Sequence, residues 1–154
     1  MKKNTYFIML TSAIILLCSC SKHFDKTGCA MNDSPKNISQ LKQQIIETGD
    51  TSAYYDLTIQ LLDFKFGDEE LLPFALIMAN KYSCNQAFFD VFNCLTAPYL
   101  SDISQIDSIT AQLAITYLLL AAEKGHWQAS KIVESHSITE EGQNHIEQLS
   151  KIFQ

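Results

Sequence analysis

Apolar residues recur every three or four positions through most of the chain after residue 37, which is the spacing of one face of an α-helix. Short polar or glycine-containing breaks separate seven such stripes, and no stretch alternates strictly at every second residue. The stripes are Ile38, Leu41, Ile45 and Ile46; Ala53, Leu57, Leu61 and Leu62; Leu72, Ala75, Leu76 and Ala79; Phe88, Val91, Phe92 and Leu95; Leu113, Tyr117, Leu120 and Ala121; Ala129, Ile132 and Val133; and Ile146, Leu149, Ile152 and Phe153. The pattern predicts an all-α domain over residues 37–154.

The breaks contain residues that end and begin helices. Gly49-Asp50-Thr51 is predicted to stop the first helix and to cap the second. Asp68 is a predicted N-cap of the third helix, with Pro73 accommodated in its first turn. Thr96 to Asp107 contains a proline and has no sustained period, so we expect a longer loop there.

An internal repeat is visible in the helical part. Gly49–Leu57 aligns with Cys84–Val91 so that Ala53 lies over Ala87, and Ala129 aligns a third time, at spacings of 34 and 42 residues. The segments that precede the second and third copies, Phe74–Tyr82 and Tyr117–Gly125, also align with each other. A helical-hairpin unit of about 35–43 residues indicates a helical solenoid.

The segment from Tyr117 to Ala129 resembles the Sel1-like repeat, a relative of the tetratricopeptide repeat. The matching positions are Tyr117, Ala121, Ala122, Gly125 and Ala129. The resemblance implies αα-hairpins stacked as a short right-handed solenoid, in which small residues let helices approach closely and Gly125 permits a sharp turn. It covers half of one unit well and Ala53 to Ala87 weakly. The family's Leu-Gly pair and glycine-rich loop are absent.

The N-terminus has the pattern of a targeting segment. Lys2 and Lys3 precede an uncharged apolar run, Tyr6–Leu17, of 12 residues. About 20 residues are needed to span a bilayer, so the run indicates a signal peptide rather than a membrane helix.

Leu17-Cys18-Ser19-Cys20 resembles the lipobox of bacterial lipoproteins, which has an aliphatic residue at −3, a small residue at −1 and the lipidated cysteine at +1. The resemblance implies that residues 1–19 are removed and that Cys20 carries lipid. This anchor would hold the protein to a membrane of the bacterial envelope, the outer in preference to the inner. The alternative is an ordinary secretory signal in which the cysteines occur by chance.

Residues 20–36 contain few large apolar side chains and are predicted to be a flexible tether. Cys29 lies in this tether, whereas Cys84 and Cys94 lie in the helical part. An exported compartment permits a disulfide between the last two if the chain turns back between them. If both lie on one helix they are about 15 Å apart and cannot pair. We favour two buried, small apolar side chains.

The charge of the chain restricts its partners. All 11 basic residues are lysines, against 17 acidic residues, which gives a net charge of −6. An acidic chain without arginine is a poor nucleic-acid binder. Glycine and proline are scarce, which argues against a β-sandwich.

The sequence contains no catalytic or cofactor motif of useful specificity. HExxH, GxSxG, CxxC and phosphate-binding glycine loops are all absent, so we expect no enzyme activity, no metal and no cofactor. His126 is interpreted as a structural residue at the repeat turn. Asp56 and Asp90 occupy equivalent repeat positions, which favours a structural or solvated role over a catalytic dyad.

Aromatic residues recur at equivalent positions of the repeat, as Tyr54-Tyr55, Phe88-Phe89 and Tyr117. Two adjacent residues cannot face the same side of a helix. Tyr55 or Phe89 is therefore a candidate for lining a concave binding groove, the usual binding surface of solenoids. The alternative is that all of these rings pack between helices.

Two functions from different classes remain. The first is a lipid-anchored interaction module that binds a protein partner, with an immunity factor against an exported toxin as a subtype. The second is an envelope enzyme or its accessory subunit. An interaction module predicts an aromatic or acidic groove, whereas an enzyme predicts convergent carboxylates in a pocket. The lack of catalytic motifs favours the interaction module.

Overall fold

The computed structural model describes residues 37–62, 64, 66–139 and 144–154. By its internal contacts the chain divides into two units, Met1–Ser34 and Pro35–Gln154, and every described residue belongs to the second. The predicted signal peptide at residues 1–19, the lipidation site at Cys20 and the tether at residues 20–36 therefore lie outside the described residues.

The described residues form seven α-helices and two short 3-10 helices, without a strand. The prediction of an all-α domain is confirmed, and each predicted stripe falls on a helix of its own. The helices are α2 (Ile38–Thr48), α3 (Thr51–Leu61), α4 (Gly67–Asn80), α5 (Asn85–Thr96), η2 (Ala97–Tyr99), η3 (Ile103–Gln105), α6 (Ser108–Glu123), α7 (Trp127–His136) and α8 (His145–Ile152). None of these helices has the length and apolar character needed to cross a bilayer.

The turn between α2 and α3 follows the prediction. Gly49 ends α2 with a φ of +66°, and a Cβ at this position would overlap the ring of Tyr82. Asp50 is the N-cap of α3, and its Oδ1 accepts hydrogen bonds from the backbone N–H groups of Ser52 and Ala53. Glycine and aspartate are therefore each required at this turn by a specific contact.

The predicted start of α4 is wrong. Asp68 lies inside the first turn, while Phe66 occupies the N-cap position without a side-chain cap hydrogen bond. The helix begins at Gly67, where glycine is needed because a Cβ would overlap the Leu61 carbonyl. Pro73 lies beyond the first turn, inside the helix, so its predicted place in the first turn is wrong as well.

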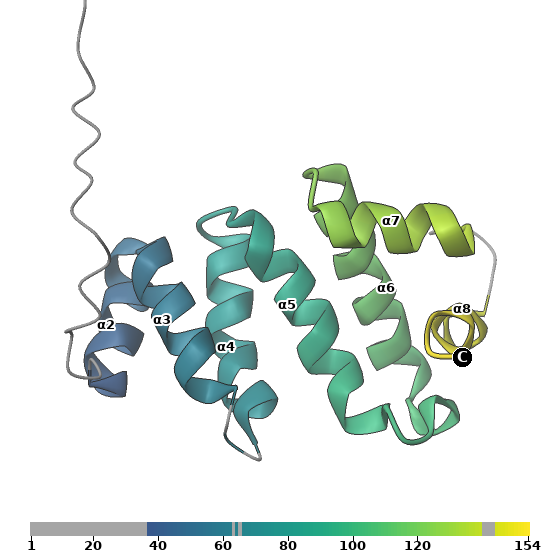
Figure 1. Cartoon of the computed structure of the whole chain (residues 1–154), viewed down its shortest axis with the longest axis horizontal. Coiled ribbons are helices and arrows are strands. Elements are labelled where there is room, and N and C mark those ends of the chain that lie inside the picture. The colour runs from purple at the N-terminus through teal and green to yellow at the C-terminus, as the bar shows by residue number, and fades with distance from the viewer. Residues whose placement is uncertain (1–36, 63, 65, 140–143) are drawn as a thin grey trace, which may run out of the picture. The chain divides into compact units, whose positions relative to one another are not determined.

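Each helix from α2 to α8 packs against the next along the chain (Figure 1). α2 also contacts α4, and α6 also contacts α8. Buried side chains from every one of these helices join a single apolar core. The order of packing therefore follows the order of the sequence.

The turns that precede α3, α5 and α7 share one backbone geometry. Gly49, Ser83 and Gly125 each have a positive φ, of 66°, 54° and 81°, and each is followed directly by the N-cap of the next helix. These three positions repeat at the same spacings of 34 and 42 residues as the aligned alanines.

The structure also explains why the two alignments in the sequence differ by one residue. The helices before the second and third turns align at a spacing of 43, whereas the alanines after these turns align at 42. The turn from α4 to α5 spans residues 81–84, while the turn from α6 to α7 spans residues 124–126. The extra residue in the first of these turns accounts for the difference.

Candidate binding groove

A cavity of about 290 Å³ lies at the surface between α3 and α5. Its walls come from one face of α3 and from the first two turns of α5, including the N-cap residue Cys84. The lining residues are Thr51, Tyr54, Tyr55, Thr58, Cys84, Gln86 and Asp90. We call this cavity the α3/α5 groove. It is comparable with the low end of the range of small-molecule sites, about 300–1,000 Å³.

Of the two aromatic residues predicted to line a groove, only Tyr55 does so. Its side chain is 65% exposed and borders the α3/α5 groove. Phe89 is only 8% exposed; its ring stacks on His126 at 4.4 Å and on Phe92 at 5.8 Å between ring centres. The structure therefore does not bring the two together, and Phe89 packs between helices instead.

A chain of hydrogen bonds joins α3, α5 and α7 at the floor of the groove. Tyr54 Oη donates to Asp90 Oδ2 at 2.7 Å, and Gln86 Nε2 donates to Asp90 Oδ1 at 2.9 Å. Gln86 Oε1 lies 3.0 Å from His126 Nε2, and His126 Nδ1 accepts from the Ala129 backbone N–H at 3.3 Å. Because Nδ1 accepts, Nε2 carries the imidazole hydrogen and donates to Gln86.

Burial changes the pKa values of the titratable side chains in this series of hydrogen bonds. It raises the pKa of Asp90, although the hydrogen bonds from Gln86 and Tyr54 and the nearby His126 oppose the shift. The pKa of Tyr54 is also raised, first by burial and then by the charge of Asp90. Burial lowers the pKa of His126, which favours the neutral ring that caps α7.

Asp90 is a buried carboxylate that has hydrogen bonds but no cationic partner among the described residues. It is 7% exposed, and none of the seven groove residues is a lysine. The ion pairs seen in the described part of the chain, Lys42 with Glu70 and Lys151 with Glu147, lie elsewhere. A carboxylate this buried normally pairs with a positive charge.

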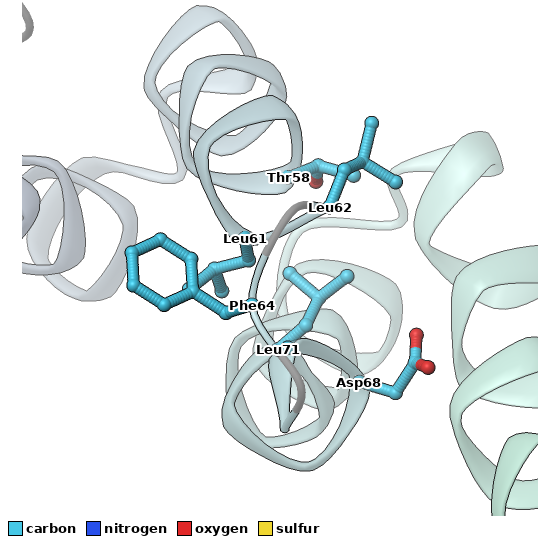
Figure 2. Close-up of a pocket in the computed structure, with 7 residues that line it drawn as sticks. Thr58, Leu61, Leu62, Phe64, Asp68 and Leu71 are labelled. Atoms are coloured by element: carbon cyan, nitrogen blue, oxygen red, sulfur yellow. The ribbon is translucent and has the colours of Figure 1, made fainter.

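A second, smaller depression of about 120 Å³ adjoins the end of α3 and the start of α4, and Thr58 lines both cavities. In the view of Figure 2, the Phe64 ring and the Asp68 carboxylate lie on opposite sides of Leu71. Two of the large apolar side chains that line it, Leu62 at 74% and Phe64, are exposed, and Ile59 on α3 is exposed as well. We call the exposed residues Tyr55, Ile59 and Leu62 the α3 stripe.

The residues predicted to pack between repeats occupy comparable positions. Ala53, Ala87 and Ala129 are each the third residue of their helix and are at most 1% exposed. Ala121 is fully buried, whereas Ala122 is half-buried.

The other two predicted repeat positions, Tyr117 and Gly125, have distinct roles. Tyr117 is buried and its hydroxyl exchanges hydrogen bonds with the side-chain amide of Asn80. Gly125 has no atom within 4 Å of the site of a Cβ, so its positive φ, rather than close approach, favours glycine.

Both described cysteines are free, and the prediction that both are buried is confirmed for Cys94 but wrong for Cys84. Cys84 and Cys94 lie at the two ends of α5, too far apart for a disulfide. Cys94 is buried, and burial raises the pKa of its thiol to about 12. Cys84 is half-buried and lines the groove.

Sequence reasoning did not identify Asp90 as a groove residue. Its repeat equivalent Asp56 suggested a structural or solvated position. The overlooked signal is local, because Asp90 lies within the apolar run Phe88–Phe92 on the most extensively buried helix surface. The described residues contain no cluster of His, Cys, Asp or Glu suited to hold a metal ion.

The fold and groove define an all-helical protein with a surface cavity between adjacent helices. Comparison of the chain with protein-family models, with curated proteins and with solved structures found no match to any of them.

Proposed function

We propose that this chain is a membrane-anchored bacterial lipoprotein whose helical domain is a short Sel1/TPR-like solenoid that binds a protein partner. Lipid at Cys20 would tether the domain to the cell envelope through residues 20–36. The proposal of an anchor rests on the lipobox-like sequence around Cys20.

Internal repetition supports the solenoid part of the proposal. Three equivalent turns precede α3, α5 and α7, and a buried alanine follows each turn at the same position. Side-chain hydrogen bonds also connect residues one unit apart: Tyr54 with Asp90 and Asn80 with Tyr117, separated by 36 and 37 residues. Stacked repeats make contacts of this kind with their nearest neighbours.

The observation that carries the binding proposal is the α3 stripe beside the α3/α5 groove. Tyr55, Ile59 and Leu62 lie on one side of α3, while Ala53, Leu57 and Leu61 bury the other side. Helices that only cover a core are normally polar on the outer face. Clustered exposed apolar side chains bordering a cavity favour a protein-binding surface.

The test is affinity capture from detergent-solubilised envelope with the full chain. We expect a partner that is retained by the wild type and lost by the double variant Tyr55→Ser, Ile59→Ser. The matched control is Ile109→Ser, Leu113→Ser, which changes an exposed apolar pair on α6. Equal capture by wild type and the α3 variant would show that the α3 stripe is not the binding surface.

The anchor is tested separately by labelled-palmitate incorporation. We expect Cys20→Ala to abolish incorporation and Cys18→Ala to leave it unchanged, because Ser19 supplies the small residue that precedes Cys20. Incorporation into the Cys20 variant at the wild-type level would contradict the lipoprotein assignment.

A further inference from the structure

We propose that the α3/α5 groove is a receptor for a lysine side chain of the protein partner, with Asp90 as its counter-ion. This inference rests on the proposed function and names the chemistry of the partner. Three features carry it: a cavity at the surface, apolar walls, and a single carboxylate at the floor.

The walls match the stem of a lysine. Tyr54, Tyr55 and Thr58 from α3 face Cys84 from α5, and these side chains offer mainly carbon and sulfur surface. Lysine buries its four-carbon stem against apolar surface and keeps its charge at the tip. A cavity of about 290 Å³ accommodates such a side chain, although it is small for a drug-sized ligand.

The floor matches the ammonium group. Asp90 lies among the groove residues and has no cationic partner in the described part of the chain. Its carboxylate accepts one hydrogen bond at each oxygen, from Tyr54 and from Gln86, and each oxygen keeps a further acceptor position. An incoming ammonium would therefore complete a pairing that the protein leaves open.

The same geometry favours lysine over arginine. A guanidinium pairs best with a carboxylate through two parallel hydrogen bonds, one to each oxygen. In this groove Tyr54 and Gln86 each take one acceptor position of Asp90, so a guanidinium would have to use the one remaining position on both oxygens at the same time. An ammonium acts as a point charge and needs only one free acceptor position.

The next junction along the chain shows how the groove can be closed. At the spacings of 34 and 42 residues, Thr58 corresponds to Phe92 and Cys84 corresponds to His126. There the ring of His126 lies on Phe89 and fills the position that is open beside Tyr55. Cys84→His is therefore expected to fill the groove while leaving Asp90 in place.

The experiment titrates the full-length chain in detergent micelles with N-acetyl-lysine-N-methylamide and follows the carboxyl ¹³C resonance of Asp90. The norleucine analogue supplies the stem without the charge, and the arginine analogue supplies the alternative cation. We expect the lysine probe to bind at least tenfold more tightly than either analogue. Asp90→Asn should abolish this preference, whereas Asp68→Asn, which changes a carboxylate in the adjoining depression, should retain it.

The pair Cys84→His and Cys84→Ser keeps the test decisive if Asp90→Asn does not fold. We expect the histidine variant to lose the lysine probe and the serine variant, which preserves the cavity, to bind it. Equal binding of the lysine and norleucine probes, tighter binding of the arginine probe, or no binding at all would overturn the inference. A captured partner that is lost by the α3 stripe variant but retained by Asp90→Asn would overturn the lysine receptor and leave the binding function standing.

Discussion

The junction of α3 with α5 and the junction of α5 with α7 are built from equivalent positions, but the α3/α5 groove lies at the first, whereas the equivalent aromatic ring at the second is buried. In both, an aromatic residue occupies the same place, Tyr55 in one and Phe89 in the other. The Phe89 ring is covered by His126, whereas the equivalent of His126 beside Tyr55 is the much smaller Cys84. The first junction is therefore open because two of its residues, Cys84 and Thr58, are smaller than their equivalents His126 and Phe92 at the second.

The comparison shows that side chains at equivalent positions can leave one junction open and fill the other, although the turns before α5 and α7 both keep a positive-φ residue just before the N-cap. The turns before α5 and α7 have the same left-handed geometry, and the alanines that follow are equally buried. The volume of the side chains at two positions decides whether the space between the helices is filled. Protein interiors are close-packed, so a smaller side chain leaves a gap that its neighbours do not fill.

The two junctions are expected to differ most in the stability lost when Phe92 or its equivalent Thr58 is replaced by alanine. Phe92 is buried and stacks near Phe89 and Phe153, so Phe92→Ala should lower the free energy of unfolding by about 3–5 kcal/mol. Thr58→Ala removes one methyl group and a hydroxyl that bonds to the backbone carbonyl of Tyr54, with a cost of about 1 kcal/mol. Urea denaturation measures both; similar losses would mean that the α3 junction is packed as tightly as the α5 junction.

A substitution at Ala129 tests whether this alanine makes a close helix contact at the second junction. It is fully buried at the third position of α7, so Ala129→Leu should overpack the contact and cost about 1–3 kcal/mol. The control Gln128→Leu changes the exposed neighbouring residue and should leave the thermal midpoint nearly unchanged. A leucine variant that melts with the wild type would remove Ala129 from the repeat contact.

His126 is the residue that closes the second junction. His126→Ala removes the cap of α7 and the ring contact with Phe89, with an expected loss of about 2 kcal/mol. His126→Asn keeps a capping side chain and should lose less. Denaturant unfolding of the two variants measures this difference directly.

The shifted pKa of His126 also leads us to expect a pH dependence of stability. Burial lowers the pKa of His126 below 6.5, so at pH values just under 6.5 the unfolded chain binds a proton there that the folded chain does not. The contribution of neutral His126 to the free energy of unfolding is therefore fully present above pH 6.5. It declines as the pH falls toward the lower pKa that His126 has in the folded chain. His126→Asn should flatten this part of the stability curve; an unchanged slope would assign it to other groups.

The smallest effect on stability is expected at Tyr55. Its side chain is largely exposed, so Tyr55→Ala should change the free energy of unfolding by no more than about 0.5 kcal/mol. Phe89→Ala at the equivalent buried position should cost about 3 kcal/mol. Comparable losses in thermal unfolding would show that Tyr55 contributes to packing rather than to a binding surface.

The sequence alone determined the helices and the equivalent turn positions that precede α3, α5 and α7. Periodic apolar residues can be buried together only on a helix, so all seven helices were predictable, and Gly49 and Asp50 marked their turn by local backbone chemistry. The start of α4 was not predictable from Asp68, because the N-cap Phe66 makes no side-chain cap bond and the need for glycine at Gly67 comes from its approach to the Leu61 carbonyl in the folded chain.

Only the tertiary structure determined which residues line the groove. Tyr55 and Phe89 are equivalent in sequence, and only the neighbouring helix determines that one ring is exposed while the other is covered by His126. Likewise, Asp90 is a member of an aspartate pair in the sequence, and its bond to Gln86 is local to α5, but its bond to Tyr54 arises only when α3 lies beside α5. Local periodicity specifies which face of a helix is apolar, whereas the volume of side chains contributed by another helix specifies whether that face is filled or left open.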